Sequence, residues 1–427
     1  MNKINILILL LILLASPVAI VSADQCLKGE CNNGQGIYQY DDGSTYTGYF
    51  KKSLFQGKGK LIFKDGSTYE GDFVQNLMYG QGKLIFKDGS TYEGDFVRNL
   101  MHGQGKLIFK DGRIYQGHFS KDKIHGQGEM IYPDGAKYSG NFKSGVKNGA
   151  GKLTYANGDY YSGSFKNNQL NGKGTFNFKN GNSYSGNFKN SQFNGKGVFS
   201  DNKGLKYSGG FKKGNFFGYG ELKKKNGELY KGSFLNNVYQ GKGYLKTPGV
   251  GEYKGDFLQG RIEGKGEYIY LNGNRYVGIL KNSQMHGSGT LFFSNGSQYK
   301  GDFIQGRMEG KGEYIYLNGN RFVGTLKNDQ IHGSGTLFFS NGSQYKGGFF
   351  KGAFQGSGVY NSSNGLKYTG AFRSGSYEGV GDLRYPDGHR YQGQFKAGLF
   401  HGRGLFTYPN GEQVDCIYRE DKIVQCL

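Results

Sequence analysis

The histidines are the first residues to consider for chemistry, because imidazole is a common base and metal ligand at neutral pH. Five of the seven histidines stand directly before a glycine, at intervals of 23 residues or its multiples: His102, His125, His286, His332 and His401. If the intervening chain is β-structure, neighbouring copies lie about 10 Å apart, two strand spacings, which is too far to share a metal. The pattern favours a structural role. His118 and His389 have no identifiable partner.

The many Gly-x-Gly pairs suggest a phosphate-binding loop at first sight. None of them continues as GxGxxG or ends in GK[ST], and each is expected within a strand rather than before a helix. The chain also has no HExxH motif, and nothing marks a nucleophile with its base. We therefore predict no catalytic residues, no metal, no cofactor and no enzyme activity.

Positive charge is the remaining chemical signal. The net charge is +21, and residues 138–252, with 18 lysines against five acidic residues, contribute +13. One interpretation is a surface for anionic lipid head groups or other polyanions; the other is solubility of an aromatic-rich sheet. The candidate anion-binding residues are Lys166, Lys173, Lys179, Lys189, Lys196, Lys212, Lys213, Lys223, Lys224 and Lys225.

These residues belong to a repeat of 23 residues, which occurs sixteen times from Tyr46 to Gln413 without insertion or deletion. In the copy that starts at Tyr69, the aromatic Tyr69, Gly71 and Phe73 alternate along one predicted strand. The positions of Gly80, Gly82, Leu84 and Phe86 alternate in the same way and predict a second strand whose glycines receive the rings.

Most copies then close on Asp-Gly or Asn-Gly, as at Asp88-Gly89, which predicts a hairpin with a type I′ turn. A single hairpin is marginally stable, so its aromatic face must be covered by its neighbours. Helix is disfavoured, because a glycine pair in every copy costs a helix about 1 kcal/mol per glycine. The expected fold is all-β: an elongated, twisted, single antiparallel sheet of about sixteen stacked hairpins.

The residues YEGDF at 69–73 and HGQGKLIFKDG at 102–112 resemble the MORN (membrane occupation and recognition nexus) repeat. The resemblance covers 46–413; one departure is Phe or Leu where the family often has Trp, and this chain has no Trp. It implies stacked hairpins and roles in scaffolding, membrane attachment or lipid binding. Some MORN proteins carry a lipid-kinase or methyltransferase domain after the repeats, and this sequence has none.

Residues 1–23 have a short positive start, an apolar centre at 6–14 and small residues before Asp24. They predict a secretory signal cleaved after Ala23. The alternative is an uncleaved membrane anchor, since the stretch 4–21 is nearly of spanning length, although Pro17 interrupts it.

The predicted organisation is a signal peptide at 1–23, a half-repeat cap at 24–45, the array at 46–413 and a half-repeat cap at 414–427. All four cysteines, Cys26, Cys31, Cys416 and Cys426, fall in the caps. Export makes disulfides the expected state, with Cys26–Cys31 and Cys416–Cys426 as the local pairing. Metal binding is the alternative, but the two pairs lie at opposite ends of the sequence without nearby histidine.

Within the array, residues 253–298 and 299–344 have nearly identical sequences. They differ only at Leu258/Ile304, Ile262/Met308, Tyr276/Phe322, Ile279/Thr325, Ser283/Asp329 and Met285/Ile331. All six changes respect the repeat pattern, which indicates duplication of a two-repeat block.

The function that the sequence favours is a non-catalytic, extended scaffold that binds a protein or a membrane surface after export, in the periplasm, a lumen, the cell surface or the medium. The alternative is a module that binds anionic lipid or another polyanion through 138–252. Expected partners are an unidentified protein, or an anionic membrane or cell-surface polymer. A second copy could also bind through sheet ends or faces. Export disfavours nucleic acid.

Overall fold

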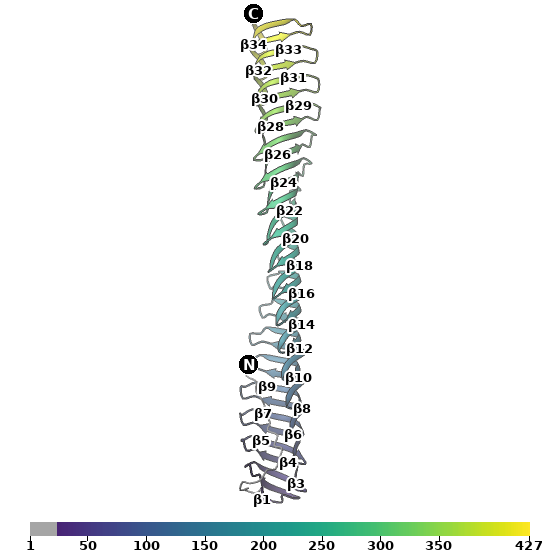
Figure 1. The fold of residues 1–427 in the computed structure, drawn as a ribbon, viewed down its shortest axis with the longest axis vertical. Coiled ribbons are helices and arrows are strands. Elements are labelled where there is room, and N and C mark those ends of the chain that lie inside the picture. The colour runs from purple at the N-terminus through teal and green to yellow at the C-terminus, as the bar shows by residue number, and fades with distance from the viewer. Residues whose placement is uncertain (1–23) are drawn as a thin grey trace, which may run out of the picture. The chain divides into compact units, whose positions relative to one another are not determined.

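A computed structural model describes residues 24–427, and every regular element in that range is a β-strand. The predicted signal peptide at 1–23 lies outside the described residues. The chain divides into two units, Met1–Ser191 and Gln192–Leu427, here called the N-terminal and C-terminal units. Within each unit, Figure 1 shows the strands following one another in chain order.

The strands of the N-terminal unit are β1 (Gln25–Gly29), β2 (Gln35–Gln39), β3 (Thr45–Lys51), β4 (Leu54–Ile62), β5 (Thr68–Val74), β6 (Leu77–Ile85), β7 (Thr91–Val97), β8 (Leu100–Ile108), β9 (Ile114–Ser120), β10 (Lys123–Ile131), β11 (Lys137–Lys143), β12 (Val146–Thr154), β13 (Tyr160–Lys166), β14 (Gln169–Asn177) and β15 (Ser183–Lys189). Each pairs antiparallel with the next.

The strands of the C-terminal unit are β16 (Gln192–Ser200), β17 (Lys206–Lys212), β18 (Asn215–Lys223), β19 (Leu229–Leu235), β20 (Val238–Thr247), β21 (Gly251–Leu258), β22 (Arg261–Tyr270), β23 (Arg275–Lys281), β24 (Gln284–Phe292), β25 (Gln298–Ile304), β26 (Arg307–Ile315), β27 (Arg321–Lys327), β28 (Gln330–Phe338), β29 (Gln344–Phe350), β30 (Ala353–Asn361), β31 (Lys367–Arg373), β32 (Ser376–Arg384), β33 (Arg390–Lys396), β34 (Leu399–Thr407), β35 (Gln413–Arg419) and β36 (Lys422–Cys426). They also pair antiparallel in chain order. The prediction of an all-β fold of stacked antiparallel hairpins is confirmed.

The core is a strip of aromatic rings on one face of each unit. Tyr69 is fully buried and packs edge to face on Phe73 of its own hairpin, at 5.1 Å between ring centroids, and on Phe96 of the next, at 4.9 Å. A Cβ atom at Gly82 would lie 2.4 Å from the Tyr69 ring, and one at Gly71 2.6 Å from it. The predicted glycine slots under the rings are therefore present, and each hairpin is covered by its neighbours.

The two glycines of the second strand do different work, which corrects the expectation that both lie under rings. Gly82 pairs with Gly71, but the next pair is Phe73 with Met78, so the register shifts between them. Gly80 lies in this β-bulge with φ +67, and its Cβ would meet the side chain of Asp72. A bulge places extra residues of one strand opposite fewer residues of its partner, and the bulged strand bends there. Glycine suits this place because it adopts positive φ at little cost in free energy.

The turns also differ from the prediction. In the loop after β6, Phe86 accepts a hydrogen bond from Gly89 N–H at 2.9 Å and donates its own N–H to Ser90 O at 2.9 Å. Only Gly89 has positive φ there, so this is a three-residue loop and not a type I′ turn. The strand ends at Ile85, one residue before the predicted aromatic position. The pair with positive φ at both residues is Gln75-Asn76, inside the repeat.

Two sets of side chains tie successive hairpins together at their ends. At the two-residue turn, the Asn76 side chain accepts the Phe55 N–H of the preceding hairpin at 2.7 Å. At the three-residue loop, Ser67 accepts the N–H of Lys87, in the following hairpin, at 3.0 Å. The turn residues thus connect the repeats as well as reversing the chain. The described part of the chain has no helix that is long and apolar enough to span a membrane.

Candidate functional site: a groove on the polar face

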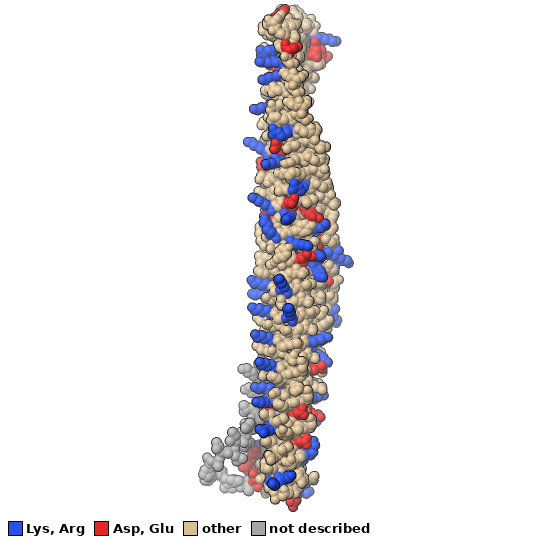
Figure 2. Space-filling model, turned by 90° about the vertical axis from the view of Figure 1, so that its right-hand side faces the viewer, with Lys and Arg blue, Asp and Glu red and all other residues tan. Residues whose placement is uncertain are grey.

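The predicted anion-binding lysines occupy different parts of the hairpin. Lys166, Lys173, Lys179 and Lys189 are in the N-terminal unit and the other six are in the C-terminal unit. Within the N-terminal unit, Lys166 and Lys189 end first strands, Lys173 lies in β14 and Lys179 lies in a loop. In Figure 2 the Lys and Arg side chains project separately at many points of the visible face.

In the C-terminal unit, local partners hold several of these lysines. Lys223 lies 2.9 Å from a carboxylate oxygen of Glu221, and Lys224 lies 2.7 Å from one of Glu228. The Lys212 ammonium lies 4.7 Å from the centre of the Phe217 ring. These contacts are at the surface, where ion pairs contribute about 0–1 kcal/mol, so the lysines remain chemically accessible. The structure does not bring the six together at one point.

The histidines at the repeated position lie in the β-bulge, one residue before its glycine, as in β8 with His102 and Gly103. Within residues 24–427, no group of three or more His, Cys, Asp or Glu side chains is arranged to hold a metal. The Nδ1 atom of His401 is buried without a hydrogen-bond partner, but His401 belongs to no such group in the described part of the chain.

The cysteines form two disulfides with the predicted pairing, Cys26–Cys31 and Cys416–Cys426. The first joins β1 to the segment that follows it, and the second joins neighbouring strands β35 and β36. Both therefore lie at the terminal strands of their own unit, where a sheet edge has no further partner strand within the described residues.

A groove that the sequence did not single out crosses seven strands of the C-terminal unit, β24 to β30, on the face opposite the buried rings. Its volume is about 1040 Å³, and it is open to solvent along its length. Backbone glycines form the floor, among them Gly301, Gly312, Gly324 and Gly335. On the opposite face of the sheet the same glycines lie under the buried rings of Tyr299 and Phe322. The glycines therefore make room for the rings on one face and leave the groove floor without side chains on the other.

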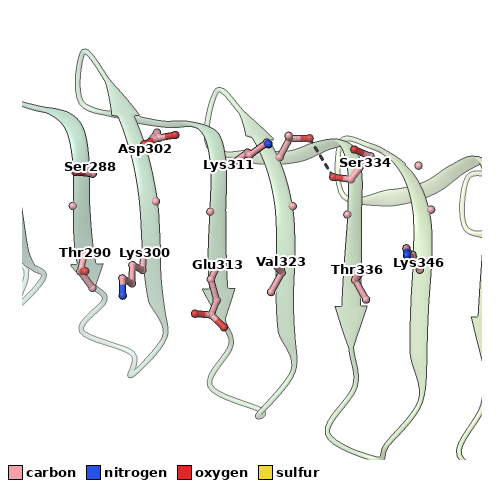
Figure 3. Close-up of a pocket in the computed structure, with 18 of the residues that line it drawn as sticks. Ser288, Thr290, Lys300, Asp302, Lys311, Glu313, Val323, Ser334, Thr336 and Lys346 are labelled. Atoms are coloured by element: carbon pink, nitrogen blue, oxygen red, sulfur yellow. Dashed lines mark hydrogen bonds between the residues drawn. The ribbon is translucent and has the colours of Figure 1, made fainter.

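Polar side chains line the floor in two rows, which Figure 3 shows on either side of the glycines. One row contains Lys300, Glu313, Val323, Thr336 and Lys346, and the other contains Ser288, Asp302, Lys311 and Ser334. Thr325 lines the groove on the other side of Gly324 from Val323 and so belongs to the second row by its position in β27. Alternation along each strand explains this order, because the side chains on both sides of each glycine project from the same face.

The charges of the groove are partly paired. Glu313 accepts a hydrogen bond from Arg321 at 2.8 Å, and the Arg321 guanidinium lies 4.2 Å from the centre of the Phe338 ring. Among the described residues, Lys300, Lys311 and Lys346 make no ion pair. Asp302, in the other row, also makes no ion pair among these residues, so the groove carries three unpaired lysines and one unpaired carboxylate. The lysines can attract an anionic group, while the hydroxyl groups can hydrogen-bond to a backbone.

Thr325 lines the groove on β27, the middle one of its seven strands. Its hydroxyl donates to the carbonyl of His332 and lies 3.4 Å from that of Ser334, so it is held against the bulge of β28. The equivalent residue in the first copy of the duplicated block is Ile279, which the groove lining does not reach. Of the six positions at which the copies differ, only this one has a second-copy residue that lines the groove. The difference between Ile279 and Thr325 is visible in the sequence, but only the structure shows that Thr325 lines the groove.

A family-model comparison matches the chain to the MORN repeat seventeen times, at residues 33–45, 46–68, 69–91, 92–112, 115–137, 138–160, 161–183, 184–206, 207–228, 230–248, 253–275, 276–298, 299–321, 322–344, 345–367, 368–390 and 391–413. The partial match 33–45 lies in the stretch predicted as a half-repeat. No curated protein matches the chain.

Three solved structures illustrate the structural similarities. The TCP domain of SAS-4 (dCPAP) from Drosophila melanogaster is 18% identical, with 36% of this chain and 85% of that chain covered and a TM-score of 0.24. The wild-type TCP10 domain of Danio rerio CPAP is 9% identical over 81% and 98%, with a TM-score of 0.13. A streptogramin B lyase is 13% identical over 76% and 93%, with a TM-score of 0.12. At these TM-scores the similarities contribute nothing to the assignment of function.

Proposed function

The chain belongs to the MORN-repeat family, and on that premise we propose that it is a non-catalytic repeat scaffold that holds a protein partner outside the cytoplasm. The observation that carries the proposal is the groove across β24–β30, because an open, polar, glycine-floored surface suits a partner that docks along several repeats. Three lysines without ion pairs among the described residues, and hydroxyl groups in both rows, supply directional contacts there.

The duplicated block provides the experiment. Thr325→Ile places in the groove the residue that the first copy already carries at Ile279, so the fold should tolerate it. We expect the wild-type protein to retain a partner from its native envelope or secretory fraction and Thr325→Ile to lose it. Ile279→Thr is the matched control, because it alters the equivalent position outside the groove and should leave capture intact.

Two results would contradict the proposal in different ways. If Thr325→Ile retains the same protein as the wild type, the groove is not the docking surface. If the wild type retains no protein in the fraction from its own compartment, the scaffold role itself is wrong. Circular dichroism of both variants checks that neither result comes from unfolding.

The proposed location outside the cytoplasm is supported by the predicted signal at 1–23 and by the two disulfides, since disulfides persist in oxidising compartments. Thiol alkylation and mass spectrometry of protein isolated from its own compartment should find no free cysteine. Four free thiols would be inconsistent with an exported protein.

A second candidate function is binding to an anionic surface through the basic stretch 138–252. In the N-terminal unit, Lys143, Lys166 and Lys189 take the same exposed place at the ends of β11, β13 and β15, which puts them in a row at intervals of about 10 Å. Among the described residues none of the three makes an ion pair. Each cation near an anionic membrane contributes about 1 kcal/mol.

This candidate is tested with vesicles that contain phosphatidylserine. Changing Lys143, Lys166 and Lys189 to Gln should weaken binding more than changing Lys52, Lys83 and Lys110, which removes equal charge at unrelated places in the same unit. Added salt should weaken the wild type as well. Equal loss in the two variants would mean that net charge, and not this row, attracts the vesicle.

A further inference from the structure

We propose that the groove across β24–β30 takes an extended segment in the polyproline II conformation that carries two acidic side chains six residues apart. The proposal rests on the function proposed above, since it specifies the ligand of the same groove. It is argued from the spacing of the strands, the placement of three side chains and the hydrogen-bonding needs of such a segment.

The spacing of the repeats matches this conformation. Adjacent strands lie about 4.8 Å apart, so equivalent positions in successive repeats lie about 9.6 Å apart along the groove. A polyproline II helix has three residues per turn and rises about 3.1 Å per residue, or about 9.3 Å per turn. One ligand turn therefore spans one repeat, and every third ligand side chain meets an equivalent strand.

A ligand in the β conformation does not have this match. Its side chains on one face recur after two residues, about 6.8 Å, which agrees with neither one nor two strand spacings. It would also cross the strands of the groove, so it could not extend their hydrogen-bonded ladders. The strand spacing thus selects between two extended conformations.

The lysines and the valine of one row fix the ligand chemistry. Lys300, Val323 and Lys346 hold the same position on β25, β27 and β29, one repeat apart. Figure 3 shows them in one row. Val323 is 40% exposed, and within residues 24–427 neither lysine has an ion pair. The two lysines are four strands apart, so the distance between them along the groove is about 19 Å. Six residues of a polyproline II helix span about the same distance.

The ligand pattern that fits is an acidic residue, two spacers, an apolar residue or proline, two spacers and a second acidic residue. The two carboxylates would face Lys300 and Lys346, and the central residue would face Val323. Glu313 lies between these contacts, but Arg321 at 2.8 Å neutralises it. The acid in this row therefore does not repel the ligand.

The floor and walls suit the backbone of such a segment. A polyproline II helix has no internal hydrogen bonds, so its carbonyl groups need donors. Ser334, Thr336 and Ser357 line the groove and can donate hydroxyl hydrogens. The floor glycines leave room between the two walls for pyrrolidine rings. A preformed polyproline II segment also loses little conformational entropy when it binds.

The test uses short synthetic peptides and the full-length protein. Fluorescence anisotropy should show binding of Asp-Pro-Pro-Pro-Pro-Pro-Asp, in which five prolines separate the two Asp. Peptides with four or six prolines between the two Asp should bind about fivefold more weakly, because one carboxylate then points away. Lys300→Glu with Lys346→Glu should lose about tenfold, as expected for two exposed ion pairs. The same variant should gain affinity for the peptide in which both Asp are replaced by Lys.

Lys254→Glu is the matched control, since Lys254 has the equivalent position on β21, in the copy where Ile279 stands in place of Thr325. It should leave peptide binding unchanged. Binding that ignores the spacing of the carboxylates, or that falls equally in Lys254→Glu, overturns the proposal, and so does absence of binding at millimolar peptide. If the peptides fail while Thr325→Ile still releases the native partner, the scaffold function stands and the ligand class is wrong.

Discussion

Tyr69 illustrates how a single-layer sheet buries a large side chain. Its ring covers Gly71 and Gly82, packs on Phe73 and Phe96, and its hydroxyl donates to Asp72 O at 3.0 Å. The ring is fully buried although no second sheet covers it within residues 24–427. At Phe322 the same slot holds a ring without a hydroxyl, so the ring is required there and the hydrogen bond is not.

This division predicts unequal effects of two conservative changes. Gly82→Ala introduces a Cβ 2.4 Å from the Tyr69 ring, and overpacking of this kind costs about 1–3 kcal/mol. Tyr69→Phe removes one hydrogen bond and should cost about 1 kcal/mol. Hydrogen exchange at β5 and β6 measures both. A larger loss of protection in Tyr69→Phe than in Gly82→Ala would be incompatible with the slot.

The buried tyrosines also predict how the protein responds to alkali. Burial raises the pKa of Tyr46, Tyr161 and Tyr207 to about 12, whereas an unfolded tyrosine has a pKa of about 10. Since the folded pKa is the higher one, this stabilisation is complete below about pH 10 and is lost as the pH rises towards 12. Tyrosinate absorbance should rise together with the loss of β-sheet circular dichroism, and ionisation of the whole set near pH 10 in the folded protein would contradict it.

At the scale of the element, each hairpin combines one tight turn, one bulge and one three-residue loop. The bulge opposite Asp72 shifts the register so that Met78 faces Phe73. The equivalent Phe55 stacks on Tyr46 with ring centroids 3.6 Å apart. This position contributes to the core in most hairpins, yet it stands outside the alternation seen in the sequence, because the bulge restores it to the buried face.

The tight turn can be tested separately from the bulge. Asn76 has φ +69 and accepts the Phe55 N–H at 2.7 Å. Asn76→Ala loses this bond and strains the backbone, which should cost about 1–3 kcal/mol. Asn76→Gly keeps the backbone conformation, as glycine does at Gly145, and should cost less. Denaturation with urea gives both values, and equal costs would show that the conformation at Asn76 adds no strain.

At the scale of the whole molecule, each repeat contacts mainly the repeats next to it. The free energy of unfolding therefore depends on the stability of each repeat, on the contacts between neighbouring repeats and on the terminal strands. Terminal strands have a partner on one side only within the described residues. Both disulfides lie at such strands, where they limit fraying of β1 and β36. The edge of an open sheet is also where unwanted pairing with other chains begins.

Removing a disulfide should therefore affect one end of the chain. By the loop-entropy estimate, Cys416→Ser with Cys426→Ser lowers the free energy of unfolding of the C-terminal strands by about 2–3 kcal/mol. Hydrogen exchange should increase in β33 to β36 and stay unchanged in β24 to β28. The corresponding change at Cys26 and Cys31 is the control for position. Increased exchange throughout the C-terminal unit would mean that the repeats unfold as one body.

Deletion of 299–344 tests whether the repeats are interchangeable. The deletion joins residue 298 to 345 and preserves the repeat phase, so we expect a folded protein with undiminished β-sheet signal per residue. After the deletion Lys254 and Val277 occupy the places of Lys300 and Val323, and Ile279 occupies the place of the groove-lining Thr325, so partner capture should be lost. Deletion of 253–298 is the control, because it leaves Thr325 and the row of Lys300, Val323 and Lys346 in place and removes only the lining residues of β24. A molten product from either deletion would contradict nearest-neighbour stability.

The sequence by itself determined the class of fold, the length of the repeat and the buried rings. Tyr69, Gly71 and Phe73 lie on one face of one strand because side chains alternate along a strand. The glycine between the two aromatic residues leaves room for a ring to lie flat against the sheet. The two disulfide pairs followed from proximity along the chain. These features depend on contacts within a hairpin or with the next one, and such contacts are encoded locally.

Only the tertiary structure decided the bulge, the turn types and the groove. Gly80 and Gly82 look equivalent in the sequence, but the register against Asp72 gives one a positive φ and the other a place under a ring. Lys300, Val323 and Lys346 are 23 residues apart and become a row because β25, β27 and β29 are aligned by pairing with the strands between them. Thr325 faces the groove by alternation within β27, but it lies beside the lining residues of β26 and β28 only because the strands pair in this register. Register between strands cannot be read from any single strand.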